Sequence, residues 1–190
     1  MKYIWGTGTL SRVVNFLVAV IIAVALPVVA AAKDLPISAF AGNWQGNAIS
    51  ENNVSVNFPI TSRDIDVSIS PADNGDFTVT WRTLLRQKGS PTNPKEVLKE
   101  TTFTYVKSEV PNVWKNNLGG DVYAGDTVSW ARISKQTLTV YVMAISDVGD
   151  YDMQVYKRTL TGPNMELEFT ALRDGVIRRT AKGRLILQSK

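Results

Sequence analysis

The chain has 190 residues, with 21 Lys and Arg, 17 Asp and Glu, and neither His nor Cys. This composition excludes Ser-His-Asp and Cys-His catalytic triads, zinc sites of the usual His and Cys type, axial His or Cys ligation of haem, and disulfide bonds. We therefore predict no metal and no cofactor, and the composition favours a non-catalytic function.

The first 32 residues have the three parts of a secretory signal. Lys2 and Arg12 form the basic start, Val13 to Ala32 form the apolar run, and the run ends in small Ala side chains that suit a signal peptidase. We predict a signal helix over residues 1–32 that is cleaved after Ala32, which places the mature protein in the periplasm or outside the cell. The alternative is an uncleaved membrane anchor, because the apolar run has the roughly 20 residues that cross a bilayer.

Residues 33–190 then form one domain, since this length is enough for a single buried core. Cleavage removes two of the 21 basic residues and leaves the 17 acidic ones, so the remaining chain is close to charge balance. A basic face of the kind that binds nucleic acid is not indicated. Contact with a membrane is expected only through the signal segment if it stays uncleaved, and the oligomeric state is left open.

Two-residue alternation with β-branched and aromatic side chains runs through residues 33–190 and predicts an all-β domain. The expected strands are Asn43–Ser50, Ile65–Ser70, Asp76–Leu85, Val97–Val106, Thr127–Ile133, Thr137–Ile145, Tyr151–Leu160, Met165–Leu172 and Val176–Leu187. Most connections between them are short and carry turn residues, which indicates hairpins between chain neighbours. We predict a single antiparallel up-and-down β-barrel of about 8–10 strands, because closure removes the sheet edges.

Two connections are longer, Gly89 to Glu96 and Glu109 to Asp126. The second contains Trp114 and a Gly-Gly pair, and an apolar, flexible loop of this length is often a lid or a binding loop. Trp114 is therefore a candidate ligand-binding residue. The alternative is that Trp114 plugs one end of the barrel in a small cluster of its own.

The start of the domain reads Phe40-Ala41-Gly42-Asn43-Trp44 and leads directly into the first strand. A Phe followed by Gly-x-Trp at this position resembles the opening motif of the calycin superfamily, which includes the lipocalins and fatty-acid-binding proteins. The resemblance implies a lipocalin-like barrel in an exported bacterial protein, with Phe40, Gly42 and Trp44 closing one end. It also implies that a basic residue of the last strand packs against the Trp, and Arg184 is the candidate.

The last predicted hairpin has two competing registers. A two-residue Asp174-Gly175 turn mixes apolar and charged side chains on one face, whereas a three-residue turn over 173–175 separates them. With the second register the inner face holds one charge, Arg179, among apolar residues. These residues are Met165, Leu167, Phe169, Ala171, Ile177, Ala181, Gly183, Leu185 and Leu187.

A four-residue loop over 161–164 pairs the preceding strand with the same face. Arg158 then meets Leu167, Tyr156 meets Phe169 and Gln154 meets Ala171. A buried, unpaired arginine costs several kcal/mol, and a ligand carboxylate would satisfy it. The pair Tyr156-x-Arg158 resembles in composition the head-group clamp of fatty-acid-binding proteins. The alternative is that these side chains face outwards or form a structural salt bridge.

These patterns predict a protein that holds a small apolar, fatty-acid-like and acidic ligand inside a barrel without chemistry. The predicted ligand-binding residues are Arg179, Tyr156, Arg158, Gln154, Phe169 and Trp114. Two alternatives stay open: a structural or envelope-interaction barrel with a filled core, and a small non-covalent isomerase or cyclase that uses the arginines and Tyr156 to polarise an oxyanion. The acidic turn from Asp147 to Asp152 has few ligands for a cation, and a polar hairpin explains it.

Overall fold

The computed structural model describes residues 33–57, 59–90 and 93–190. Buried and exposed side chains alternate along most of its segments, as the sequence pattern predicts. The elements are η1 (Ile37–Phe40), β1 (Gly42–Asn52), β2 (Ile60–Pro71), β3 (Phe77–Ser90), β4 (Asn93–Lys107), β5 (Val113–Asn116), η2 (Val122–Ala124), β6 (Val128–Ser134), β7 (Thr137–Ile145), β8 (Tyr151–Thr161), β9 (Asn164–Arg173) and β10 (Val176–Ser189).

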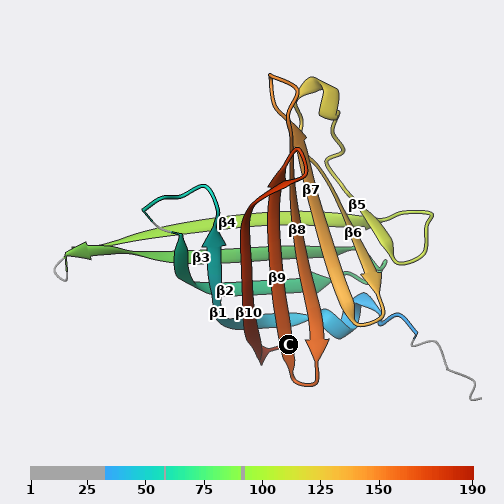
Figure 1. The fold of residues 1–190 in the computed structure, drawn as a ribbon. Coiled ribbons are helices and arrows are strands. Elements are labelled where there is room, and N and C mark those ends of the chain that lie inside the picture. Colours follow the sequence, from blue (N-terminus) through green and yellow to red (C-terminus); the bar gives the residue numbers. More distant parts are fainter. Residues whose placement is uncertain (1–32, 58, 91–92) are drawn as a thin grey trace, which may run out of the picture. The chain divides into compact units, whose positions relative to one another are not determined.

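The ten strands form a closed antiparallel barrel in which every strand pairs with its neighbours in the chain. Pairing of β1 with β10 closes the sheet, and Figure 1 shows these two strands side by side. In the same view β1 to β4 cross β7 to β10, and the hairpin of β3 and β4 extends past the strands beside it. The predicted all-β, up-and-down barrel is confirmed, and each strand pairs on both sides over at least part of its length.

The predicted signal segment lies outside the described residues. Residues 33–190 belong to one compact unit. Within the part of the chain that the structure describes, no helix is long and apolar enough to cross a membrane.

One end of the barrel is closed by the segment that precedes β1. Phe40 is fully buried, and its carbonyl oxygen accepts a hydrogen bond of 3.0 Å from the indole N–H of buried Trp44. The amide of Leu35 donates to the carbonyl of Lys135 at 2.8 Å, which ties the segment to the β6–β7 turn. Phe40 and Trp44 thus lie buried at the end of the barrel where β1 begins, and we call this the closed end.

The prediction that Arg184 packs against Trp44 as the closing base is wrong. The side chain of Arg184 is 67% exposed, and one of its guanidinium nitrogens lies 3.7 Å from a carboxylate oxygen of Glu166 on the outer face. Arg184 follows Gly183 and precedes the fully buried Leu185, and side chains of a strand alternate between its two faces. The side chain of Arg184 therefore points away from the interior. Its pairing partner on β1 is the exposed Asn47.

The prediction of a three-residue turn between β9 and β10 is also wrong. It is a two-residue turn, with Asp174 and Gly175 both at positive φ, and Arg173 pairs with Val176. A register shift between Ile177 and Arg179 then moves the pairing by one residue, so that Phe169 stands opposite Ala181 and not opposite Thr180. This β-bulge near the start of β10 thus separates apolar from charged side chains in the way that we expect from a three-residue loop. Arg179 faces inwards as predicted, but Ile177 is 47% exposed.

Two predicted loops contain strand. The connection from Glu109 to Asp126 holds the four residues of β5, which pair with both β4 and β6. The connection from Gly89 to Glu96 is largely replaced by the ends of β3 and β4, which pair as far as Ser90 and Asn93. Pairing partners supply the backbone hydrogen bonds in both places, and this overrides a local composition that favours turns.

Two glycines allow β1 and β10 to approach closely at the seam. A Cβ at Gly46 would overlap the backbone carbonyl oxygen of Arg184, and a Cβ at Gly183 would overlap that of Asn47. Both obstacles are backbone atoms, so a side-chain rotation does not relieve them.

We expect Gly46→Ala to lower the free energy of unfolding by about 1–3 kcal/mol, although alanine is normally the better strand residue. Urea unfolding measures this loss. The neighbouring exposed substitution Gln45→Ala serves as the control and should change stability by less than about 0.5 kcal/mol. A Gly46→Ala protein as stable as the wild type would mean that the seam between β1 and β10 can open without cost.

Candidate functional site

A cavity of about 270 Å³ lies inside the barrel. Its lining residues on β1 and β10, Ser50 and Arg179, stand far along these strands from Trp44 and Leu187, so the cavity faces the end opposite η1. We call that end the open end. The described lining residues are Ser50, Arg63, Ile65, Trp81, Thr83, Lys99, Thr101, Gln154, Tyr156, Arg158, Leu167, Phe169, Arg179 and Ala181.

Five of the six predicted ligand-binding residues lie in this wall. Gln154, Tyr156 and Arg158 come from β8. Phe169 comes from β9 and Arg179 from β10. The predicted pairing of β8 with β9 is confirmed, since Arg158 stands opposite Leu167, Tyr156 opposite Phe169 and Gln154 opposite Ala171. The predicted inward orientation therefore holds for all five residues, and their contact with a ligand stays a prediction.

Trp114 is not among the described residues that line the cavity. Its indole N–H donates to the carbonyl of Gly75 at 2.9 Å, and its ring meets that of Phe77 edge to face at 5.5 Å between centroids. Gly75 belongs to the β2–β3 turn at the closed end of the barrel. Trp114 is thus a buried packing residue of that end, which is the alternative that the sequence left open.

Arg158 is the largest fully buried side chain of the described residues. None of its three guanidinium nitrogens has a hydrogen-bond acceptor among the residues that the structure describes. Its guanidinium carbon lies 5.1 Å from the ring centroid of Trp81 and 5.6 Å from that of Tyr156, so two aromatic faces are its electrostatic partners. Burial lowers the pKa of Arg158 to about 10, and the side chain is still a cation at neutral pH.

Aromatic rings connect Arg158 to the open end. The ring of Tyr156 lies 4.7 Å from that of Trp81 and 4.8 Å from that of Phe169. The guanidinium of Arg179 lies over the other side of this row, 5.2 Å from the centroid of Phe169. The cavity therefore has an apolar, aromatic wall between two arginines.

Sequence reasoning missed two further cations of the wall, Arg63 and Lys99. Arg63 lies two residues before the first strand residue that we predict on β2, and it shares the inner face with Ile65 and Val67. Lys99 lies within the predicted β4 and shares the face of Thr101 and Phe103. Continuing the two-residue alternation outwards from the buried positions would have found both.

The four basic residues face no carboxylate among the described lining residues. Burial lowers the pKa of Arg63, and the neighbouring charge of Arg179 lowers it further. The Nε of Arg63 is buried and has no acceptor among the described residues. The interior is thus positively charged and under-supplied with hydrogen-bond acceptors, which an anion would provide.

The tyrosines of the interior are poor proton donors and acceptors for chemistry. Burial raises the pKa of Tyr156, and its hydroxyl donates to the side-chain oxygen of Gln154 at 2.7 Å. Burial also raises the pKa of Tyr105 to about 12, and its hydroxyl is bonded to that of Ser129. Both phenols are therefore neutral at physiological pH, which suits binding better than proton transfer.

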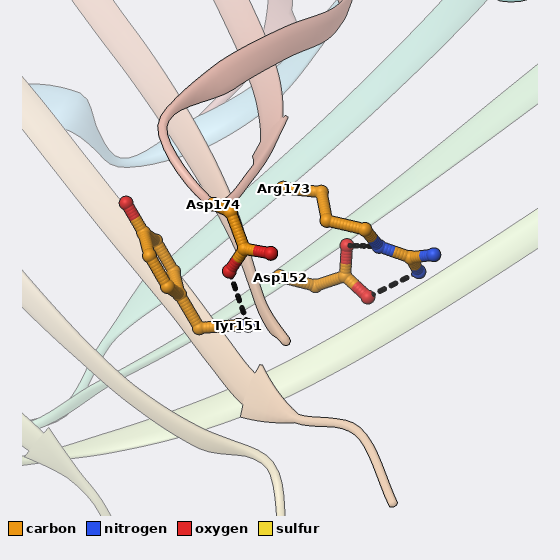
Figure 2. A network of polar contacts seen from close by, with 4 residues as sticks. All are labelled: Tyr151, Asp152, Arg173 and Asp174. Atoms are coloured by element: carbon orange, nitrogen blue, oxygen red, sulfur yellow. Dashed lines mark hydrogen bonds and ion pairs between the residues drawn. The ribbon is translucent and has the colours of Figure 1, made fainter. Parts of the chain in front are cut away.

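Two acidic side chains, Asp152 at the start of β8 and Asp174 in the β9–β10 turn, are engaged in contacts at the open end (Figure 2). Both carboxylate oxygens of Asp152 accept hydrogen bonds from the guanidinium of Arg173, at 2.9 and 2.6 Å. Next to this pair, the carboxylate of Asp174 accepts from the amide of Tyr151 at 3.0 Å. Within the described residues no group of acidic side chains is arranged to hold a metal ion.

The fold is similar to that of a solved protein of unknown function from the DUF3598 family of Nostoc punctiforme. The TM-score is 0.55 at 12% sequence identity, and the match covers 86% of this chain and 53% of the other. This chain thus spans about half the length of that relative. The likeness is one of fold.

Two other solved structures match less closely. The S-type phycobiliprotein lyase CPES from Guillardia theta has a TM-score of 0.49 at 10% identity, with 82% of this chain and 94% of the lyase covered. A putative outer membrane protein from Bacteroides fragilis has a TM-score of 0.21 at 12% identity, with 80% and 99% covered. No family model matches the sequence, and no curated protein does.

Proposed function

We propose that this protein is a lipocalin-like binding protein whose barrel holds a small molecule with an apolar body and an acidic group, without chemistry. The observation that carries the proposal is Arg158, a fully buried cation that has no hydrogen-bond acceptor among the described residues. A buried charge without a partner is costly, and the bound anion would remove that cost.

The surroundings of Arg158 support a ligand of this kind. The rings of Trp81, Tyr156 and Phe169 offer an apolar surface along the cavity, and a guanidinium matches the two oxygens of a carboxylate. The cavity of about 270 Å³ also supports binding over the alternative of a barrel filled by its own side chains. Among the described residues of the site, no contact favours the isomerase or cyclase.

The first experiment is native mass spectrometry of the protein purified from its own compartment, followed by calorimetric titration with decanoate at pH 7. We expect a co-purifying acid, or binding of decanoate that is at least tenfold weaker in Arg158→Met. Such a loss corresponds to about 1.4 kcal/mol of binding free energy. If nothing co-purifies and decanoate does not bind the wild type, the proposal fails.

We also propose that the protein acts in the periplasm or outside the cell. The support is the signal pattern of residues 1–32. Intact mass measurement of the protein from its native host tests this. A mature chain beginning at Lys33 is expected, and a chain that retains residues 1–32 would favour the membrane anchor.

A further inference from the structure

We infer that the ligand carries two anionic groups at opposite ends of an apolar body, one for Arg158 inside the barrel and one for Arg63 and Arg179 near the open end. This inference rests on the proposed function and deepens it, because it names the charge and length of the ligand. It depends on the spacing of the cations, on the absence of carboxylates among the described residues that line this cavity, and on the aromatic residues between the cations.

The two positive regions are separated along the barrel. On β9, Arg158 stands opposite Leu167, whereas Arg179 stands opposite Ala171, four residues further along the strand. At roughly 3.3 Å per residue the backbones of these two positions are about 13 Å apart along β9. The two guanidinium groups also lie over different rings, Arg158 over Tyr156 and Arg179 over Phe169, so a carboxylate bound at Arg158 leaves Arg179 to a second anion.

On β8 and β9 the wall between the two regions is aromatic, and Ser50, Thr83 and Thr101 add polar side chains elsewhere in the lining. Phe169 lies between Leu167 and Ala171 on β9. Its neighbours on the adjacent strands are Tyr156 of β8 and the buried Ala181 of β10. Arg158 lies over Tyr156 and Arg179 lies over Phe169, so each guanidinium covers one end of the ring pair. This arrangement suits a ligand that is apolar in its middle and charged at both ends.

The region near the open end has the character of an anion site in its own right. Arg63 on β2 and Arg179 on β10 lie close enough to repel, since Arg179 contributes to lowering the pKa of Arg63. Lys99 from β4 lines the same cavity. The Nε of Arg63 is buried without an acceptor among the described residues. An anion placed between these side chains would both accept hydrogen bonds and remove the repulsion.

The test compares three probes by calorimetry at pH 7 and constant ionic strength: decanoate, decanedioate and hexanedioate. Decanedioate has the second carboxylate at the far end of a ten-carbon chain, and hexanedioate has the same charge on a chain too short to reach both regions. We expect decanedioate to bind the wild type about tenfold more tightly than decanoate, and hexanedioate to bind most weakly.

The variant for this test is Arg63→Gln combined with Arg179→Gln, with each single substitution as a second measurement. We expect decanedioate to bind this double variant more weakly than decanoate does, because the second carboxylate must still be desolvated and no longer finds a cation. Arg184→Gln removes a cation of β10 from the outer face, and it should leave the preference for decanedioate unchanged.

The outcomes separate this inference from the proposed function. If decanoate binds through Arg158 but decanedioate binds no better, or if its advantage survives in the double variant, the second anion site is wrong and the binding function stands. An equal gain for hexanedioate would also overturn the inference, since it would show that charge alone matters and length does not. If none of the probes binds and nothing co-purifies, both proposals fail.

Discussion

Replacing Arg158 with Met is expected to stabilise the ligand-free protein and to weaken its binding of decanoate at least tenfold. The substitution removes a buried charge that has no acceptor among the described residues and keeps an unbranched apolar chain that is shorter than arginine. Exchange of buried ionic groups for apolar ones raises the free energy of unfolding by about 1–4 kcal/mol in favourable cases, and we expect a gain in this range. Thermal and urea unfolding without ligand measure the gain.

The opposite movement of stability and binding is what identifies Arg158 as a ligand site. If Arg158 had only a structural role, through its contacts with Trp81 and Tyr156, the substitution would make the protein less stable, because two cation–π contacts disappear. The matched control is Arg184→Met, an exposed arginine of β10, which should change stability by less than about 0.5 kcal/mol. A less stable Arg158→Met protein with intact decanoate binding contradicts the prediction.

Replacing Phe40 with Ala is expected to cost the largest amount of stability of any substitution discussed for this protein, about 3–5 kcal/mol. Phe40 is fully buried. It lies in η1, before the first strand, and has no strand pairing to hold it in place. Its removal leaves a void above Trp44, whose indole is bonded to the carbonyl of the same residue. Total stabilities of such domains are about 5–15 kcal/mol, so the loss is a large share.

Urea unfolding followed by tryptophan fluorescence measures this loss. Tyr123→Ala is the matched control, because that ring is 91% exposed in η2 and its removal should change stability by less than about 0.5 kcal/mol. A loss below about 1 kcal/mol in Phe40→Ala would show that the barrel is stable without its closing segment. Residues 40–44, which resemble the calycin opening motif, would then contribute little to the stability of this barrel.

The interior of the last three strands could be predicted because a single register separates apolar from charged side chains. The pairing of β8 with β9 follows from that rule, and it correctly turns Tyr156 and Arg158 inwards. The turn before β10 shows its limit, since the two-residue turn and the register shift at Ile177 together have the same effect on the faces as one longer loop. Two local geometries that lead to the same face pattern cannot be separated by the pattern.

Arg63 and Lys99 were missed for a different reason. Both lie on the inner face of their strands near the open end, where polar residues replace apolar ones in the lining, so the hydrophobic pattern does not mark these positions as inward. Trp81 was interpreted as packing, and it is both packed and part of the cavity wall, opposite Tyr156. These three residues come from β2, β3 and β4, and only closure of the barrel brings them to β8 and β10.

The sequence by itself thus determined the class of fold and the inward side of β8, β9 and most of β10, because these follow from periodicity between neighbouring residues and neighbouring strands. The tertiary structure decided which inward residues share a cavity. It brought Arg63, Arg158 and Arg179 together around one apolar wall and left Trp114 at the other end. Meeting across a barrel depends on strand number and register around the ring, and no local pattern encodes either.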